Sequence, residues 1–226
     1  MKLYRKERLT DGTRNVYVCG MKMMSYKCKK QPPKAKVFVH GEQNDIVLAD
    51  PTNPNLSIEV YGNNNTVRIE TEAGFTAHLC IGTADCPVSD CTIVVGKKTT
   101  SSGPIFVRML ESNSRLTIGE DCMFATNVNI YVSDTHCILD KEGKLTNIGR
   151  FVEIGDHCWI CFESKILKNT RIPTGCVVGM GAVVASQFSE ANCVLVGNPA
   201  RIVKREITWD RMRPQAWLNE NTPSQG

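Results

Sequence analysis

The sequence places an aliphatic residue at every sixth position through its C-terminal half. The unbroken series consists of Ile148, Ile154, Ile160, Ile166, Ile172, Val178 and Val184. Four positions further on in each repeat stand small or medium-sized residues: Val152, Cys158, Ser164, Thr170, Cys176 and Ala182. An α-helix repeats about every 3.6 residues and a strand about every two, so a period of six indicates neither of them alone.

A six-residue period is typical of a chain that winds in three short strands per turn, with about eighteen residues in each coil. Each strand then pairs with its equivalents in the coils above and below, about 4.8 Å away. The large aliphatic residue fills the interior, and the small residue allows the backbone to turn the corner. The predicted fold class is all-β, a parallel β-helix with a triangular cross-section.

The N-terminal half repeats the pattern less regularly. Residues 40–48 match residues 61–69, with Gly and Asn supplying the turns between short strands. The six-residue spacing recurs at Ile69, Phe75, Ile81, Ile93 and Ile105, and after a slip it recurs at Ile118, Phe124 and Ile130. Pro87 and Thr99 interrupt it. We expect about eight or nine coils in a domain of residues 37–205.

The segments outside this domain differ from it in composition. Residues 1–36 hold eleven Lys and Arg against Glu7 and Asp11, a balance of +9, whereas the whole chain of 226 residues carries +4. This segment is predicted to be a basic N-terminal arm or cap, which could attract a polyanion or could simply be solvated. Residues 206–226 are predicted to be a C-terminal tail.

The composition favours a cytoplasmic protein. The first residues lack the apolar run of a signal peptide, and no stretch approaches the roughly 18 apolar residues of a membrane span. The eleven cysteines are therefore expected to be free thiols. Cys158 and Cys161 form a lone C-x-x-C pair that the repeat packing explains, so we predict no metal. We also expect no nucleic-acid partner and no transmembrane segment.

Four motifs carry a resemblance to a known family. They are IGRFVEIGDHCWI at 148–160, VGMGAVV at 178–184, VGNPARIVK at 196–204 and SDTHCILD at 133–140. With them the chain resembles the hexapeptide-repeat acyltransferases, and it is most similar to the capsule and polysialic acid O-acetyltransferases. The resemblance covers roughly residues 37–205. It implies a left-handed coil, a homotrimer, acetyl-CoA as the acetyl donor, and a saccharide acceptor that could be polyanionic.

One segment does not fit the dry interior of a β-helix. The six-residue count from Ile130 to Ile148 assigns His136 and Glu142 to interior positions. Burying an unpaired ionisable group there would cost several kcal/mol. Residues 133–145 are therefore predicted to bulge outward, and a bulge on a rigid repeat scaffold is a favourable place for function.

The resemblance implies roles for particular side chains. His136 would be the general base that removes the proton of an acceptor hydroxyl while the hydroxyl oxygen attacks the thioester directly. Asp134 or Asp140 could orient the imidazole, and the sequence leaves both open. Trp159 precedes the buried Ile160, so it points outward, and the resemblance implies a place at the site of acetyl-CoA and acceptor. A place in a subunit interface is the alternative, and the two roles can coexist.

The resemblance also implies a binding site for acetyl-CoA. The outer backbone of Gly179, Met180 and Ala182 would line the pantetheine arm, and Arg201 and Lys204 would meet the nucleotide phosphates. Galactoside acetyltransferases carry Thr-Lys after this Gly-x-Gly stretch, where the present chain has Ala-Ser. One expected phosphate contact is therefore missing.

Two other functions are compatible with the same repeat. The first is an N-acetyltransferase that acts on a nucleotide-linked amino sugar with the same base and cofactor site. The second is a non-catalytic β-helix that binds sugar, which would need neither His136 nor the closing VGNPAR motif. A γ-type carbonic anhydrase is disfavoured, because the four histidines include no H-x4-H pair for zinc.

Overall fold

The computed structural model describes residues 4–8, 13–18, 21–27, 34–72 and 74–221. Its contacts divide the chain into two compact units, Met1–Lys34 and Ala35–Gly226. In the first unit, β1 (Tyr4–Arg8), β2 (Thr13–Val18) and β3 (Met21–Lys27) form an antiparallel sheet in the order β1-β2-β3. The second unit holds the six-residue repeats.

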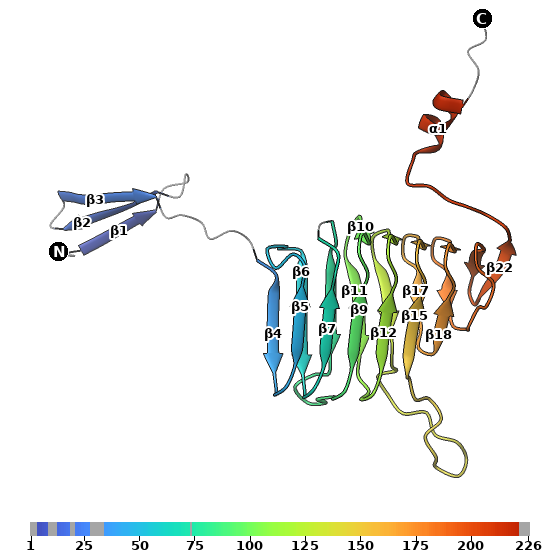
Figure 1. Ribbon diagram of the computed structural model, residues 1–226. Coiled ribbons are helices and arrows are strands. Elements are labelled where there is room, and N and C mark those ends of the chain that lie inside the picture. The colour runs from blue at the N-terminus through green and yellow to red at the C-terminus, as the bar shows by residue number, and fades with distance from the viewer. Residues whose placement is uncertain (1–3, 9–12, 19–20, 28–33, 73, 222–226) are drawn as a thin grey trace, which may run out of the picture. The chain divides into compact units, whose positions relative to one another are not determined.

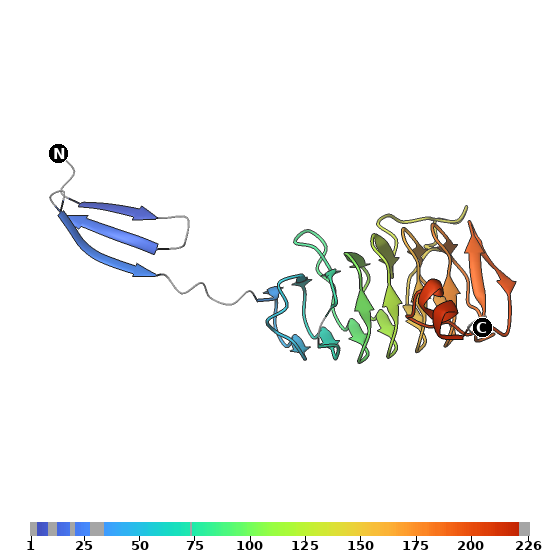
Figure 2. The ribbon, with the colours of Figure 1, turned by 90° about the horizontal axis from the view of Figure 1, so that it is seen from above.

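The second unit winds into a prism with three sides, each of them a sheet of stacked strands (Figures 1 and 2). Face 1 consists of β4 (Lys36–His40), β6 (Leu56–Tyr61), β8 (Ala77–Ile81), β11 (Ile105–Met109), β14 (Val128–Tyr131), β17 (Lys165–Ile166) and β20 (Val183–Val184). Face 2 consists of β5 (Asp45–Leu48), β7 (Thr66–Ile69), β9 (Thr92–Val95), β12 (Arg115–Ile118), β15 (Phe151–Ile154) and β18 (Thr170–Ile172). Face 3 consists of β10 (Thr100–Ser101), β13 (Met123–Phe124), β16 (Trp159–Ile160), β19 (Val177–Val178), β21 (Val194–Gly197) and β22 (Ala200–Lys204). Neighbouring strands are parallel on all three faces, except that β22 runs antiparallel to β21.

The prism interior is built from the residues that the six-residue period selects. All of the following are at most 3% exposed: Ile154, Ile160, Ile166, Ile172, Val178 and Val184. The small residues four positions on are buried as well, from Val152 to Ala182. Equivalent residues stack along the prism axis, as where Ile130 of β14 pairs with Ile166 of β17. The predicted all-β, parallel architecture is confirmed.

Ile148 keeps the spacing of the series but lies outside the prism. Its side chain is 38% exposed, and β15 begins only at Phe151. The interior register of face 2 is instead set by Val152, which pairs with Leu116 of β12. The segment between Ile130 and Ile148, although the two residues are spaced by one expected coil length, therefore does not form a further coil of the prism.

Four cysteines form a column at the corner that leads into face 3, and all four are 0% exposed: Cys122, Cys158, Cys176 and Cys193. Their thiols are free. A thiol is small enough for the inside of a tight corner, and burial raises the pKa of the Cys176 thiol and keeps it protonated. In the part of the chain that the structure describes, no group of His, Cys, Asp or Glu side chains could hold a metal ion.

The prism has fewer coils than the eight or nine predicted. Face 1 has seven strands, because most coils are longer than the repeat suggests. Register partners on this face are 21 residues apart at Ser57 and His78, and 36 residues apart at Asn129 and Lys165. The spacing falls to 18 residues between Lys165 and Val183. The added residues lie in loops at the corners.

Pro87 and Thr99 interrupt the period for different reasons. Pro87 is exposed in an insertion between β8 and β9, outside the coil. Thr99 is 0% exposed and occupies an interior position at the corner. Its hydroxyl donates to the Gly119 carbonyl at 2.8 Å and accepts from the Cys122 N–H at 3.1 Å. A buried hydroxyl that is satisfied in this way costs little.

The predicted C-terminal tail contains packed structure. After β22 the chain folds back along the outside of the prism, where Trp209 is only 9% exposed. The helix α1 (Pro214–Asn221) follows, has no buried residues and stands clear of the prism in Figure 1. No helix among the described residues has the length and apolar character needed to cross a membrane.

Candidate active site

A long loop, residues 133–149, leaves the prism between β14 and β15 and projects from it in Figure 1. Both ends of the loop are anchored to the coil next to it. Ser133 Oγ accepts a hydrogen bond from the Leu110 N–H at 2.6 Å. The Gly149 N–H donates to the Glu111 carboxylate at 2.6 Å. The loop is therefore held to the rigid prism at its base.

His136 lies on this loop with an exposed side chain, so the predicted outward bulge is confirmed. It lines a cavity of about 430 Å³ together with Glu111, Asn113 and Arg150. Asn147 donates to the His136 carbonyl at 2.8 Å and so holds the local backbone. Among the described residues, neither ring nitrogen of His136 has a hydrogen-bonding partner. An imidazole in this condition can take a proton from a substrate hydroxyl.

The two candidate carboxylates do not hydrogen-bond to the imidazole. Asp134 Oδ2 accepts from Lys168 Nζ at 2.5 Å and from Asn147 Nδ2 at 2.7 Å. Burial alone would raise the pKa of the Asp134 carboxyl, but these two donors outweigh it and hold the pKa below its ordinary value. Asp140 accepts from two backbone N–H groups of its own turn, at 3.0 and 2.8 Å. Both carboxylates shape the loop, and Asn147 links Asp134 to the His136 carbonyl, so a role of Asp134 or Asp140 in orienting the imidazole stays a prediction.

Trp159 points outward from β16, as predicted, and is half-buried. It lines a hollow of about 280 Å³ on face 3, together with Thr100, Ser101 and Met123. This hollow and the cavity of His136 have no lining residue in common. His136 lies at the corner between faces 1 and 2, whereas Trp159 lies on face 3. A single chain does not bring the two residues together.

Three of the residues predicted for acetyl-CoA share one edge of face 3. Gly179 and Met180 form the turn between β19 and β20, and Met180 is 73% exposed. Val196 packs closely on Gly179: a Cβ added to Gly179 would lie 2.6 Å from Cγ1 of Val196. Val196 pairs in turn with Arg201 of β22, whose side chain is exposed.

The other two predicted residues lie elsewhere. Lys204 is exposed at the opposite end of β22, where it pairs with Val194. Ala182 is 1% exposed, and its side chain faces the prism interior. Its N–H donates to the Gly179 carbonyl at 3.1 Å, and its carbonyl accepts from the Lys165 N–H at 2.9 Å. Ala182 therefore presents only its backbone towards the outer surface, and the predicted role of that backbone along the pantetheine arm stays a prediction.

Trp209 is a residue near the candidate site that the sequence motifs did not indicate. Its ring centroid lies 5.9 Å from that of Trp159. A signal was present in the segment 207–210. The apolar Ile207 and Trp209 alternate there with the polar Thr208 and Asp210. Such alternation is typical of an extended segment that packs along one side.

Comparison with known proteins gives close relatives, although no family model matches the sequence. The chain is 35% identical over 178 residues to a polysialic acid O-acetyltransferase of Neisseria meningitidis, a match that covers 78% of this chain and 80% of that protein. It is 29% identical over 120 residues to the polysialic acid O-acetyltransferase of Escherichia coli O1:K1 / APEC. That second match covers 53% of this chain and 38% of the length of its relative.

Two solved structures share the fold. The crystal structure of the polysialic acid O-acetyltransferase OatWY matches with a TM-score of 0.56 and 30% identity, over 82% of this chain and 96% of that chain. The polySia-specific acetyltransferase NeuO matches with a TM-score of 0.62 and 24% identity, over 84% and 94% of the two chains. Both are left-handed β-helices, so the predicted hand is confirmed.

The triangular prism and its relatives define the class of protein: it is a left-handed β-helix acetyltransferase. Within this class, the chain belongs to the family of the polysialic acid O-acetyltransferases. The resemblance on which the sequence analysis relied is therefore confirmed.

Proposed function

We propose that the chain transfers the acetyl group of acetyl-CoA to a hydroxyl group of polysialic acid or of another acidic surface polysaccharide. The observation that carries this proposal is the imidazole of His136, exposed at a cavity of about 430 Å³ in a chain of this family. The names of two relatives support the acceptor. A cytoplasmic location is part of the proposal, since the described cysteines are free thiols, as in a reducing compartment.

His136 acts as the general base in this proposal. Its unprotonated ring nitrogen takes the proton of the acceptor hydroxyl while the oxygen attacks the thioester carbonyl, so a free alkoxide need not form. A carbon–oxygen ester bond forms, the carbon–sulfur bond breaks, and the imidazolium returns its proton to the departing CoA sulfur. The transfer is direct, so both substrates are bound together and no acetyl-enzyme forms.

A second protomer completes the proposed site. His136 and Trp159 lie on different sides of one prism, so a site that holds both takes His136 from one protomer and Trp159 from the next. A contact of this head-to-tail kind closes into a ring when the rotation between protomers fits. We therefore propose a homotrimer with three equivalent sites between neighbouring prisms.

The outer surfaces of the prism support faces 1 and 3 as the contact surfaces. Face 2 carries ion pairs typical of a solvated surface, in which Glu153 bonds to Arg115 and Arg171. Face 1 instead exposes the aromatic rings of Phe106 and Tyr131, at 41% and 38%. Exposed aromatic surface of this extent is typical of protein interfaces. Face 3 carries the half-buried Trp159.

Gly179, Met180 and Arg201 are proposed to contact acetyl-CoA. They share one edge of face 3, and a guanidinium keeps its charge for a phosphate at any working pH. Lys204 is proposed as a second phosphate contact, from the far end of β22. The outer backbone of Ala182 is proposed to line the pantetheine arm, since its side chain faces the prism interior.

The basic N-terminal segment is proposed to concentrate a polyanionic acceptor near the enzyme. Residues 1–36 carry a balance of +9. Attraction of this kind reaches over about a Debye length, about 8 Å at physiological ionic strength, and weakens as salt is added. Removing residues 1–34 should raise KM for a long acidic polymer and leave KM for a short neutral acceptor unchanged.

The test of the proposed function is acetyl-CoA consumption with three classes of acceptor: polysialic acid, a neutral polysaccharide and a nucleotide-linked amino sugar. We expect the highest kcat/KM with polysialic acid, and we expect it to fall as salt rises. Activity confined to the amino sugar would make the protein an N-acetyltransferase instead. Consumption with none of the three would favour the non-catalytic scaffold.

A further inference from the structure

The residues that follow β22, here called the strap (residues 205–213), lie across the corner between faces 2 and 3. The strap bonds to four levels of the prism, those of β21, β16, β13 and β10. The Ile207 N–H donates to the Asn192 carbonyl at 2.9 Å. Trp209 Nε1 donates to the His157 carbonyl at 2.8 Å. Further along, Arg211 reaches the coils that contain β10 and β13. The strap is thus tied to the backbone of the prism along its length.

Trp209 of the strap packs against His157 of the prism corner. Their rings stack with centroids 4.3 Å apart and planes inclined by 13°. His157 Nε2 lies 3.1 Å from the Trp209 carbonyl, while the Trp209 indole N–H donates to the His157 carbonyl. The pair is therefore fixed by ring stacking and by the hydrogen bond from the indole N–H of the strap to the corner.

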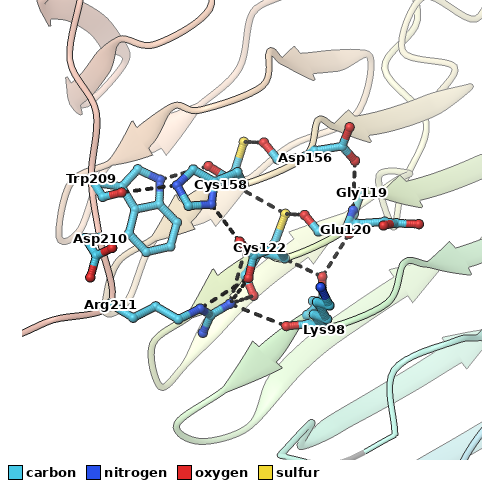
Figure 3. A network of polar contacts seen from close by, with 12 residues as sticks. Lys98, Gly119, Glu120, Cys122, Asp156, Cys158, Trp209, Asp210 and Arg211 are labelled. Atoms are coloured by element: carbon cyan, nitrogen blue, oxygen red, sulfur yellow. Dashed lines mark hydrogen bonds and ion pairs between the residues drawn. The ribbon is translucent and has the colours of Figure 1, made fainter.

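Asp121 ties this pair to the next coil. One of its carboxylate oxygens lies 2.8 Å from His157 Nδ1, and the other lies 3.0 Å from Arg211 Nη2. Figure 3 shows the Arg211 side chain pointing from the strap toward Cys122 and Lys98. Burial alone would raise the pKa of the Asp121 carboxyl, but the hydrogen bonds from His157 and Arg211 outweigh it and keep the pKa below its ordinary value. Asp121, His157, Trp209 and Arg211 form one unit, here called the latch.

The latch touches the hollow on face 3 from outside. Trp209 lies against Trp159, with ring centroids 5.9 Å apart and planes inclined by 40°. Arg211 Nη1 donates to Thr100 Oγ1 at 2.8 Å. Trp159 and Thr100 both line the hollow, so the strap contacts two of its walls.

We propose that Trp209 is a positioning residue for acetyl transfer: held by the latch, it fixes the indole of Trp159 and so sets the shape of the hollow. An indole on an open strand can adopt several staggered rotamers, and packing against Trp209 restricts this choice. The inference rests on the proposed function, in which Trp159 belongs to the active site.

The test is a double-mutant cycle on kcat and KM, with acetyl-CoA and polysialic acid as substrates. Trp209→Ala should lower kcat/KM about 10- to 100-fold, the size of effect that a small displacement in an active site produces. Once Trp159→Ala has removed the indole, adding Trp209→Ala should change kcat/KM by no more than about twofold. Trp209→Phe, which keeps an aromatic ring at the contact, should recover most of the loss.

The matched control is Trp217→Ala on α1, which removes the same side chain at a position 54% exposed. It should leave kcat/KM within about twofold of the unmodified protein, because Trp217 is not part of the latch. Near-ultraviolet circular dichroism gives a readout apart from activity. The signal of the coupled indoles should vanish equally in Trp159→Phe and Trp209→Phe.

Losses that add in the double variant would overturn the inference, since Trp209 would then act independently of Trp159. Unchanged kinetics of Trp209→Ala would overturn it too. If Trp209→Ala does not fold, His157→Asn, which keeps Trp209 but weakens the latch, is taken through the same cycle. Full activity of Trp159→Ala is a different result, because it removes Trp159 from the active site and refutes that part of the proposed function as well. If the unmodified protein acetylates no acceptor, the proposed function fails, and the dichroism alone decides whether Trp209 holds Trp159.

Discussion

His136 is held through its backbone, and Asn147, which binds its carbonyl, is itself bonded to the Asp134 carboxylate. The loop that carries it is anchored at Ser133 and Gly149, and Asn147 binds the carbonyl of His136 itself. The imidazole is therefore placed by its main chain while the ring stays available. For a general base this arrangement leaves the proton-accepting nitrogen free until a substrate arrives.

Replacing this imidazole gives the first prediction. His136→Ala should lower kcat by about two to four decades, the usual worth of a positioned base, while acetyl-CoA binding is kept. Steady-state kinetics and calorimetric titration with acetyl-CoA measure the two effects separately. Ping-pong kinetics, or an acetyl group trapped on the neighbouring Cys137, would contradict direct transfer.

Asp134 gives a prediction about acid. Its pKa in the folded protein is lowered by Lys168 and Asn147 against the effect of burial, so folding favours its charged form. The resulting stability is present above the unfolded value of about 3.9 and is lost as pH falls through the lower folded value. The melting temperature should therefore differ between the unmodified protein and Asp134→Asn at pH 7, and this difference should shrink towards pH 2.5. Lys168→Gln should lose a large share of the pH-dependent part, because it removes the charged one of the two donors and leaves Asn147. A difference that stays constant with pH would contradict this account.

At the scale of the elements, the corners of the prism decide which residues are tolerated. Gly62 is buried at a corner with φ of +124°, and a Cβ there would lie 1.9 Å from the Val88 carbonyl oxygen. Gly143 also has a positive φ, of +78°, but lies in the exposed loop with nothing within 4 Å of an added Cβ. A side chain at either glycine would be strained by the positive φ, but only at Gly62 would it also clash with the neighbouring coil. Comparing the two positions therefore separates these two contributions to stability.

This pair gives the third prediction. Gly62→Ala should lower the free energy of unfolding by roughly 3 kcal/mol or more, because both the backbone angle and a backbone clash oppose it. Gly143→Ala should cost about 1 kcal/mol, since only the left-handed conformation is penalised. Urea unfolding followed by circular dichroism measures both values. Equal costs for the two variants would show that close coil contact at Gly62 is unimportant.

At the scale of the whole molecule, the proposed site takes His136 from one copy of the chain and Trp159 from another. The two residues line cavities with no lining residue in common. The exposed aromatic rings of face 1 offer a surface that a neighbouring prism can cover. The proposed trimer would thus bury apolar surface and assemble the site in one step.

Mixing two inactive variants tests this assembly. When His136→Ala and Trp159→Ala chains are expressed together in equal amounts, about one quarter of the sites should combine an intact His136 with an intact Trp159. Activity should reappear in the mixture, and light scattering should give about three times 25.1 kDa. A mixture as inactive as each variant alone, or an active monomer, would refute the shared site.

The six-residue period alone determined the prism, its parallel pairing and, apart from Ile148, the interior residues of its C-terminal coils. It could do so because each coil repeats the same packing problem, so Ile154, Ile160 and Ile166 meet identical surroundings one coil after another. The same period assigned His136 to an aliphatic interior position. Because an unpaired ionisable side chain is costly to bury, this predicted that the segment around His136 leaves the interior. Family motifs supplied the hand and the chemistry.

Only the tertiary structure decided the arrangement of the segments that do not follow the six-residue period. Corner insertions changed the number of coils, because loops at the prism edge add residues without adding strands. The partners of Asp134 and of Trp209 are distant in sequence, Lys168 in the first case and His157 in the second. A sequence repeat specifies how each coil pairs and packs with the next coil. It carries no information on how a loop or the C-terminal segment packs across several coils.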